Sequence, residues 1–176
     1  ETGFSGVTAG ECERRVRLAQ GAGLLHDIKR KEKHHAAAGA RFCRQLLAGY
    51  PFSGSEVDAI CLAIGNHEAF GANEAADTQW GALLSDCLYD ADKFRWGPEN
   101  FTHTIWAMLS YRDVTVAQLL KHYPRGMDFM KKIRSTFRTA TGRRYGPQFI
   151  DLGVAIGEEL YEYMQTTYGG SLDAKK

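Results

Sequence analysis

The stretch Gly23-Leu-Leu-His-Asp-Ile-Lys-Arg30 places two leucines directly before an adjacent histidine and aspartate, His26 and Asp27. An apolar segment that ends in an imidazole and a carboxylate needs a partner for both groups, because burying an unpaired carboxylate is costly. A metal ion is one of the few partners that satisfies both. A single His-Asp pair is also what an ordinary helix end can carry, so the rest of the chain has to be considered.

The composition predicts one domain, or one domain with an extension, in a chain of 176 residues. An apolar fraction of 44% is enough for a core, and a net charge of +1 argues against specific nucleic-acid binding. No run has the length of a membrane span, so we expect no membrane association. The four cysteines contain no CxxC pair, which favours free thiols in a reducing, cytoplasmic compartment. The oligomeric state is left open.

Apolar residues recur at spacings of three and four along most of the chain, and no useful alternation typical of strands occurs. The fold class is therefore predicted to be all-α. We expect Ser55 to cap a helix whose buried face starts at Val57, and a loop over 139–147. The spacing predicts helices over about 11–25, 35–47, 57–67, 80–96, 101–109, 114–122, 127–137 and 149–163.

Two further histidines are predicted to face the core. His35 starts a face that continues with Ala38, Gly39, Phe42 and Leu46. His67 continues the spacing of the helix that precedes it and is followed by Glu68. Farther along, Asp90 and Asp92 flank the centre of a buried helical face on opposite sides, so helical geometry alone does not select between them.

Imidazole and carboxylate ligands without thiolate suit Zn, Mn, Fe, Co or Ni, and a site with fewer nitrogens suits Mg. Several such residues in one core can hold one or two divalent metal ions. Two ions about 4 Å apart form a clamp for in-line displacement at phosphorus, with a hydroxide as the nucleophile.

The order of these segments resembles the HD-domain metal-dependent phosphohydrolase superfamily over roughly residues 12 to 96. The pieces that carry the resemblance are Leu24-Leu-His-Asp27, His35-Ala-Ala-Ala-Gly-Ala40, Asn66-His-Glu68 and Asp90-Ala-Asp-Lys93. The resemblance implies an HD-type helical core over residues 1–100. Additional helices over 101–176 are expected to pack on the same domain.

The resemblance also implies roles for individual residues. Asp27 would bridge two ions, and Asp92 would be the closing ligand, with Asp90 as the alternative. Glu68 is expected to orient a ligand histidine or to assist proton transfer, and together with Asp27 it forms the predicted catalytic pair. The implied metal ligands are His26, Asp27, His35, His67 and Asp92, and the candidate substrate-binding residues are Lys29, Arg30, Lys93 and Arg95.

One feature departs from the family pattern, whose first ligand is a histidine on a helix before the doublet. No histidine precedes His26 in this sequence. Either the native chain extends upstream, or the core lacks its first ligand helix. The leading expectation is a phosphohydrolase that cleaves a phosphate mono- or diester of a nucleotide or similar small metabolite by a metal-activated hydroxide. The alternatives are a catalytically impaired regulatory or ligand-binding module with the same fold, and a structural helical domain with unrelated histidines.

Overall fold

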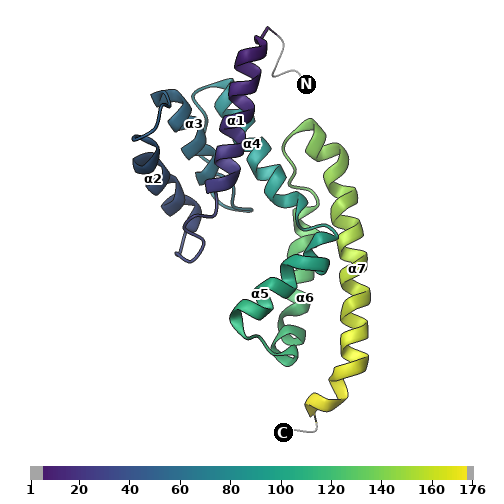
Figure 1. Cartoon of the computed structure of the whole chain (residues 1–176). Helices are drawn as coiled ribbons and strands as arrows, with labels where there is room; N and C mark the ends of the chain where they lie inside the picture. The colour runs from purple at the N-terminus through teal and green to yellow at the C-terminus, as the bar shows by residue number, and fades with distance from the viewer. Residues whose placement is uncertain (1–5, 174–176) are drawn as a thin grey trace. The chain divides into compact units, whose positions relative to one another are not determined.

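The computed structural model describes residues 6–173, with side chains up to residue 168 (Figure 1). It confirms the all-α prediction, and no strand occurs in the described range. The helices are α1 (Ala9–Leu25), α2 (His35–Leu47), α3 (Gly54–Gly65), α4 (Gln79–Phe94), the π-helical turn η2 (Asn100–Thr104), α5 (Ile105–Arg112), α6 (Val116–Ile133) and α7 (Ala140–Asp173).

The chain divides into two compact units, the first ending at Asp92 and the second beginning at Lys93. The sequence analysis placed its boundary at residue 100. The packing of the later helices on the same domain as the HD-type core stays a prediction, and the outermost residues of both predicted ranges, 1–5 and 174–176, lie outside the described residues.

Capping boxes start two helices of the first unit. The Thr8 hydroxyl accepts from the backbone N–H of Glu11, whose carboxylate accepts from Thr8 in return. The prediction of Ser55 as the cap of α3 is wrong, because Ser53 and Glu56 form that capping box. Asp58, which Ser55 would have needed for the same motif, pairs with Arg44 instead.

Small residues let α2 and α3 approach closely in the first unit. A Cβ on Gly39 would lie 3.3 Å from the Ile64 side chain and 3.5 Å from the carbonyl oxygen of His26. This glycine therefore brings the start of α2 close to the segment after α1. Leu46, expected on the buried face of α2, is 36% exposed, whereas Leu47 is 5% exposed. The core of this unit contains Leu18, Ala22, Cys43, Leu47, Val57, Ile60, Cys61, Ile64, Leu84 and Leu88.

Two of the predicted boundaries in the second unit are wrong. The expected break between 122 and 127 lies inside α6, which contains Pro124. Pro124 has no backbone N–H to donate, but burial of one continuous face of α6 outweighs this lost hydrogen bond. The neighbouring Tyr123 also holds the helix in place, because its hydroxyl donates to the carbonyl of Gly157 at 2.8 Å. The expected loop over 139–147 is the first part of α7, where the backbone N–H of Gly142 donates to the Thr139 hydroxyl at 2.8 Å.

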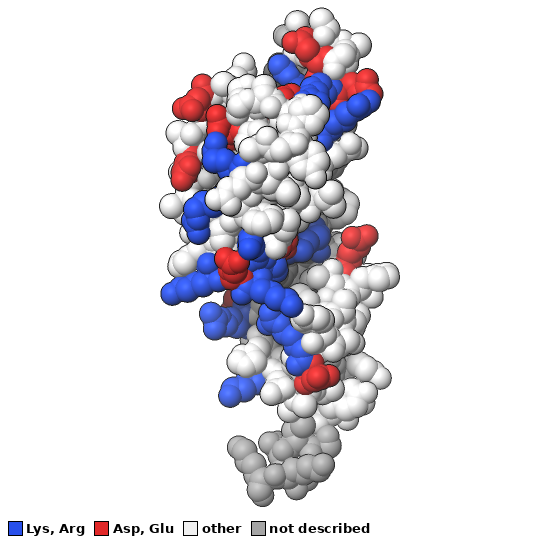
Figure 2. Space-filling model, turned by 60° about the vertical axis from the view of Figure 1, so that its left-hand side comes forward, with Lys and Arg blue, Asp and Glu red and all other residues white. Residues whose placement is uncertain are grey.

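Charged side chains of both signs share the face drawn in Figure 2. This mixture agrees with the small net charge of +1. Within residues 6–173, no helix combines the length and the apolar character needed to cross a membrane.

Candidate metal centre

The site lies in the first unit, where the ends of α1 and α3 meet the start of α2. His26 directly follows α1, Asp27 is the next residue, His35 is the first residue of α2, and His67 lies two residues beyond α3. The side-chain exposures are 20% for His26, 26% for Asp27, 11% for His35 and 3% for His67. The four side chains are therefore buried or partly buried, and Asp27 is the most exposed of them.

Two of the histidines are oriented by the helices that they follow. The last carbonyl groups of an α-helix have no partner within the helix. His26 uses one of them, because its Nδ1 lies 2.7 Å from the carbonyl oxygen of Gly23. His67 does the same at α3, with its Nδ1 2.6 Å from the carbonyl oxygen of Ile64. A carbonyl can only accept, so Nδ1 carries a proton in both rings, and Nε2 has a lone pair when the ring is neutral.

His35 is oriented by a carboxylate instead, since it begins a helix rather than ending one. Its Nδ1 lies 2.8 Å from Oε1 of Glu68, which follows His67 directly. The carboxylate accepts from Nδ1–H, and Nε2 of His35 therefore also keeps its lone pair. All three imidazoles consequently present an Nε2 lone pair to the inside of the cluster.

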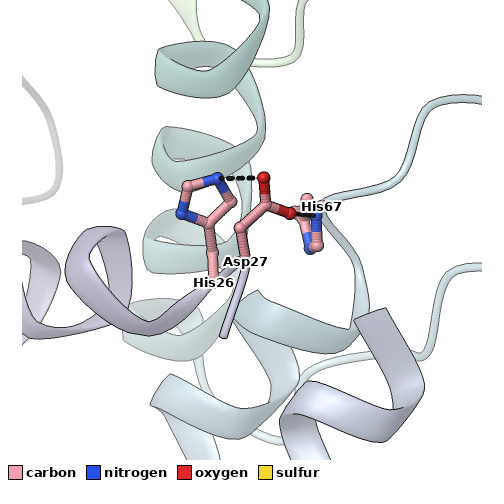
Figure 3. Close-up of side chains that lie close together, drawn as sticks. All are labelled: His26, Asp27 and His67. Atoms are coloured by element: carbon pink, nitrogen blue, oxygen red, sulfur yellow. Dashed lines mark ion pairs between the residues drawn. The ribbon is translucent and has the colours of Figure 1, made fainter. Parts of the chain in front are cut away.

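The three Nε2 atoms surround the Asp27 carboxylate. Its Oδ1 lies 3.3 Å from Nε2 of His35 and 3.5 Å from Nε2 of His67, and its Oδ2 lies 3.7 Å from Nε2 of His26. Figure 3 shows the carboxylate between His26 and His67, with one oxygen directed at each. The ligand atoms of His26, Asp27 and His67 all lie within 4.8 Å of one another.

Asp92 joins the His26 side of the cluster from α4. Its side chain is 7% exposed, and its Oδ1 lies 3.6 Å from Nε2 of His26. Asp90 is also buried, at 3% exposure. The contact with His26 favours Asp92 over Asp90 as the aspartate of the site, and its role as a ligand stays a prediction.

The charges of the cluster shift several pKa values. Burial acts to raise the pKa of Asp27, but the neighbouring His67, Arg30 and His26 lower it to about 2. The Asp92 carboxylate raises the pKa of His26. Burial lowers the pKa of His35, with Arg30 and His67 acting in the same direction. Asp27 is therefore a carboxylate at neutral pH, as a metal ligand must be.

The donor set fits a divalent metal. Nε2 of His26 and Oδ1 of Asp27 are buried and make no hydrogen bond among the described residues. Nε2 of His35 lies 3.2 Å from Nε2 of His67, although both Nδ1 atoms have acceptors as partners. Two imidazole nitrogens that bind the same ion at about 2.1 Å each lie at most about 4.2 Å apart, so the observed separation would allow one ion to bind both. A cation between the lone pairs would remove their repulsion and satisfy the orphaned atoms.

The predicted substrate-binding residues have different environments. The ammonium of Lys29 lies 3.1 Å from Glu32 and 4.7 Å from the centre of the Phe42 ring. The guanidinium of Arg30 contacts His35 and Asp27. Lys93, which is 3% exposed, and the half-buried Arg95 belong to the second unit, and their substrate-binding roles stay predictions.

Asn66 supports the site, although the sequence analysis gave it no role. Its amide Nδ2 donates to the carbonyl of Glu74 at 2.9 Å and to the Ser85 hydroxyl at 3.2 Å, and its Oδ1 accepts from the N–H of Glu74 at 2.9 Å. These bonds tie the residue before His67 to the following loop and to α4. In the sequence, the only sign that Asn66 holds this loop in place was its polar side chain directly before His67.

Searches against family models, curated proteins and solved structures find no match to this chain.

Proposed function

We propose that this chain is an HD-type, metal-dependent phosphohydrolase that cleaves a phosphate mono- or diester of a nucleotide or similar small metabolite. The observation that carries the proposal is the arrangement of His26, His35 and His67, whose Nε2 lone pairs converge on Asp27. The order of these residues along the chain, and their resemblance to the HD-domain superfamily, link this arrangement to phosphate esters.

The ligands fall into two halves around the two oxygens of Asp27. Oδ1 faces His35 and His67, whereas Oδ2 faces His26, which Asp92 also approaches. A carboxylate that has a histidine beside each oxygen is suited to act as a bridging ligand between two divalent ions. The His35 half offers two imidazoles and a carboxylate oxygen, and the His26 half offers one imidazole and two carboxylates.

The charged residues of the site would hold the ions and orient the phosphate ester. Divalent ions at this site would polarise a phosphate ester and lower the pKa of water at neutral pH. Asp27 and Asp92 would offset the positive charge of the ions, and Arg30, whose side chain is 56% exposed, would offer a guanidinium to the phosphate from the solvent side. Glu68, whose side chain is 40% exposed, holds His35 in the orientation that presents Nε2.

The test is the metal content of the purified full chain together with a screen of phosphate mono- and diesters. We expect about one or two divalent ions per chain after incubation with Mn²⁺, Fe²⁺ or Zn²⁺, and ester hydrolysis that chelation abolishes and added metal restores. Metal bound without hydrolysis of any ester would favour a catalytically impaired binding module. A chain that takes up no metal would contradict the proposal.

Replacing Glu68 by glutamine separates its two predicted roles. The amide oxygen can still accept from His35 but carries no charge, so we expect Mn²⁺ to bind at least about tenfold more weakly. If Glu68 only orients His35, saturating metal restores kcat and the pH profile is unchanged. If Glu68 also transfers a proton, kcat stays low at saturating metal and one limb of the pH profile is lost. Glu32→Gln, an exposed site in the same unit, is the matched control.

A further inference from the structure

Arg30 enters the cluster from the turn between α1 and α2. Its Nη1 lies 3.0 Å from Nε2 of His35, and its Nε lies 3.7 Å from Oδ2 of Asp27. The guanidinium therefore contacts two of the candidate metal ligands while most of its side chain remains exposed.

The contact with His35 uses the lone pair that a metal would need. Because Nδ1 of His35 donates to Glu68, Nε2 is the only acceptor of that ring. One lone pair can accept from an arginine N–H or bind an ion, but it cannot do both. A guanidinium at this distance would also repel a divalent cation held between His35, His67 and Asp27.

We propose that Arg30 competes with a metal ion for the His35 half of the site. Without the ion, the guanidinium donates to His35 and offsets the negative charge of Asp27. When an ion binds, Arg30 leaves His35 and becomes available to a phosphate group on the exposed side. This inference rests on the proposed function, since it assumes that a divalent ion binds at these ligands.

The competition makes metal and phosphate help each other to bind. A phosphate that engages Arg30 draws it from His35 and so favours the ion. By linkage, the ion favours phosphate binding by the same factor. The turn that carries Arg30 also holds Lys31 and Lys33, while Glu32 pairs with Lys29, so the turn is net positive toward an approaching anion.

The test is a titration of the metal-free chain with Mn²⁺, with and without inorganic phosphate, for wild type, Arg30→Met and Lys33→Met. Lys33 is an exposed residue of the same turn, so its replacement removes the same charge without removing a contact to His35. We expect Arg30→Met to bind Mn²⁺ about tenfold more tightly than wild type, with Lys33→Met close to wild type. Phosphate should tighten Mn²⁺ binding more in wild type than in Arg30→Met.

Other results overturn the competition. Equal or weaker Mn²⁺ binding in Arg30→Met, with wild-type circular dichroism, would make Arg30 a supporting residue of the site. If Arg30→Met and Lys33→Met tighten Mn²⁺ binding equally, Arg30 acts only through its positive charge, as any nearby basic residue would. If none of the three proteins binds Mn²⁺, both the proposed function and the competition are contradicted. This outcome differs from the first two, which contradict the competition alone.

Discussion

Asp27→Asn is expected to remove bound metal from the chain and to lower phosphate ester hydrolysis by at least about a thousandfold. Asp27 is the residue that all three imidazoles share, with its two oxygens 3.3 to 3.7 Å from their Nε2 atoms. Asparagine has nearly the same shape but no charge, and its amide can donate to a histidine lone pair that a metal would otherwise use. The loss of a ligand that serves both halves of the site should exceed the roughly 10- to 100-fold loss typical of residues that only orient ligands.

The measurements are metal per chain by elemental analysis and the initial rate with the best ester from the screen. Asp58→Asn is the matched control, because Asp58 lies in the same unit and pairs with Arg44 on the surface. Metal content and rate should be close to wild type in that control. An Asp27→Asn chain that keeps its metal and its rate would show that the cluster is not the centre of the reaction.

Gly153→Ala is expected to lower the free energy of unfolding by at least about 3 kcal/mol. A Cβ at this position of α7 would lie 2.6 Å from the carbonyl oxygen of Trp96 and 2.9 Å from the backbone of Gly97. Both contacts are to backbone atoms, which cannot rotate away as the end of a side chain can. Relief of the overlap would require α7 to move away from the segment that follows α4, with loss of packing in the second unit.

Gly126→Ala is the control with the opposite expected sign. Gly126 lies inside α6, and a Cβ there would meet nothing within 4 Å. The substitution should stabilise the chain by up to about 1 kcal/mol, because alanine has the higher helix propensity. Urea unfolding followed by circular dichroism compares both variants with wild type. A neutral Gly153→Ala would mean that α7 does not approach residues 96 and 97 at this glycine.

The glycines of α7 show why the sequence analysis mistook part of a helix for a loop. Glycine is common in loops, and the segment predicted as a loop, 139–147, contains Gly142 and Gly146. A Cβ on Gly146 would lie 2.3 Å from the Phe137 ring, so this glycine is needed for close packing rather than for a turn. A propensity scale cannot distinguish these two uses of glycine, because the difference lies in a neighbour that the local pattern does not contain.

The histidines of the candidate site were easier to predict from the sequence than the start of α7. His35 starts α2 at the residue where the spacing placed it, and it is buried as expected. His67 is buried although α3 ends at Gly65, because its ring turns back to the last turn of that helix. Local periodicity identifies buried positions, and two buried histidines and a partly buried one near aspartates restrict the chemistry to a small set.

The amino-acid order alone was sufficient for the all-helical class, for most helices of the first unit and for the residue types of the candidate metal site. Those features depend on periodicity and side-chain chemistry, which are local properties. The contact of Asp92 with His26, the pairing of His35 with Glu68 and the approach of His35 to His67 depend on distances between segments remote in the chain. Such distances arise only when α1, α2, α3 and α4 pack together, because packing selects which carboxylate or imidazole from another segment each histidine meets.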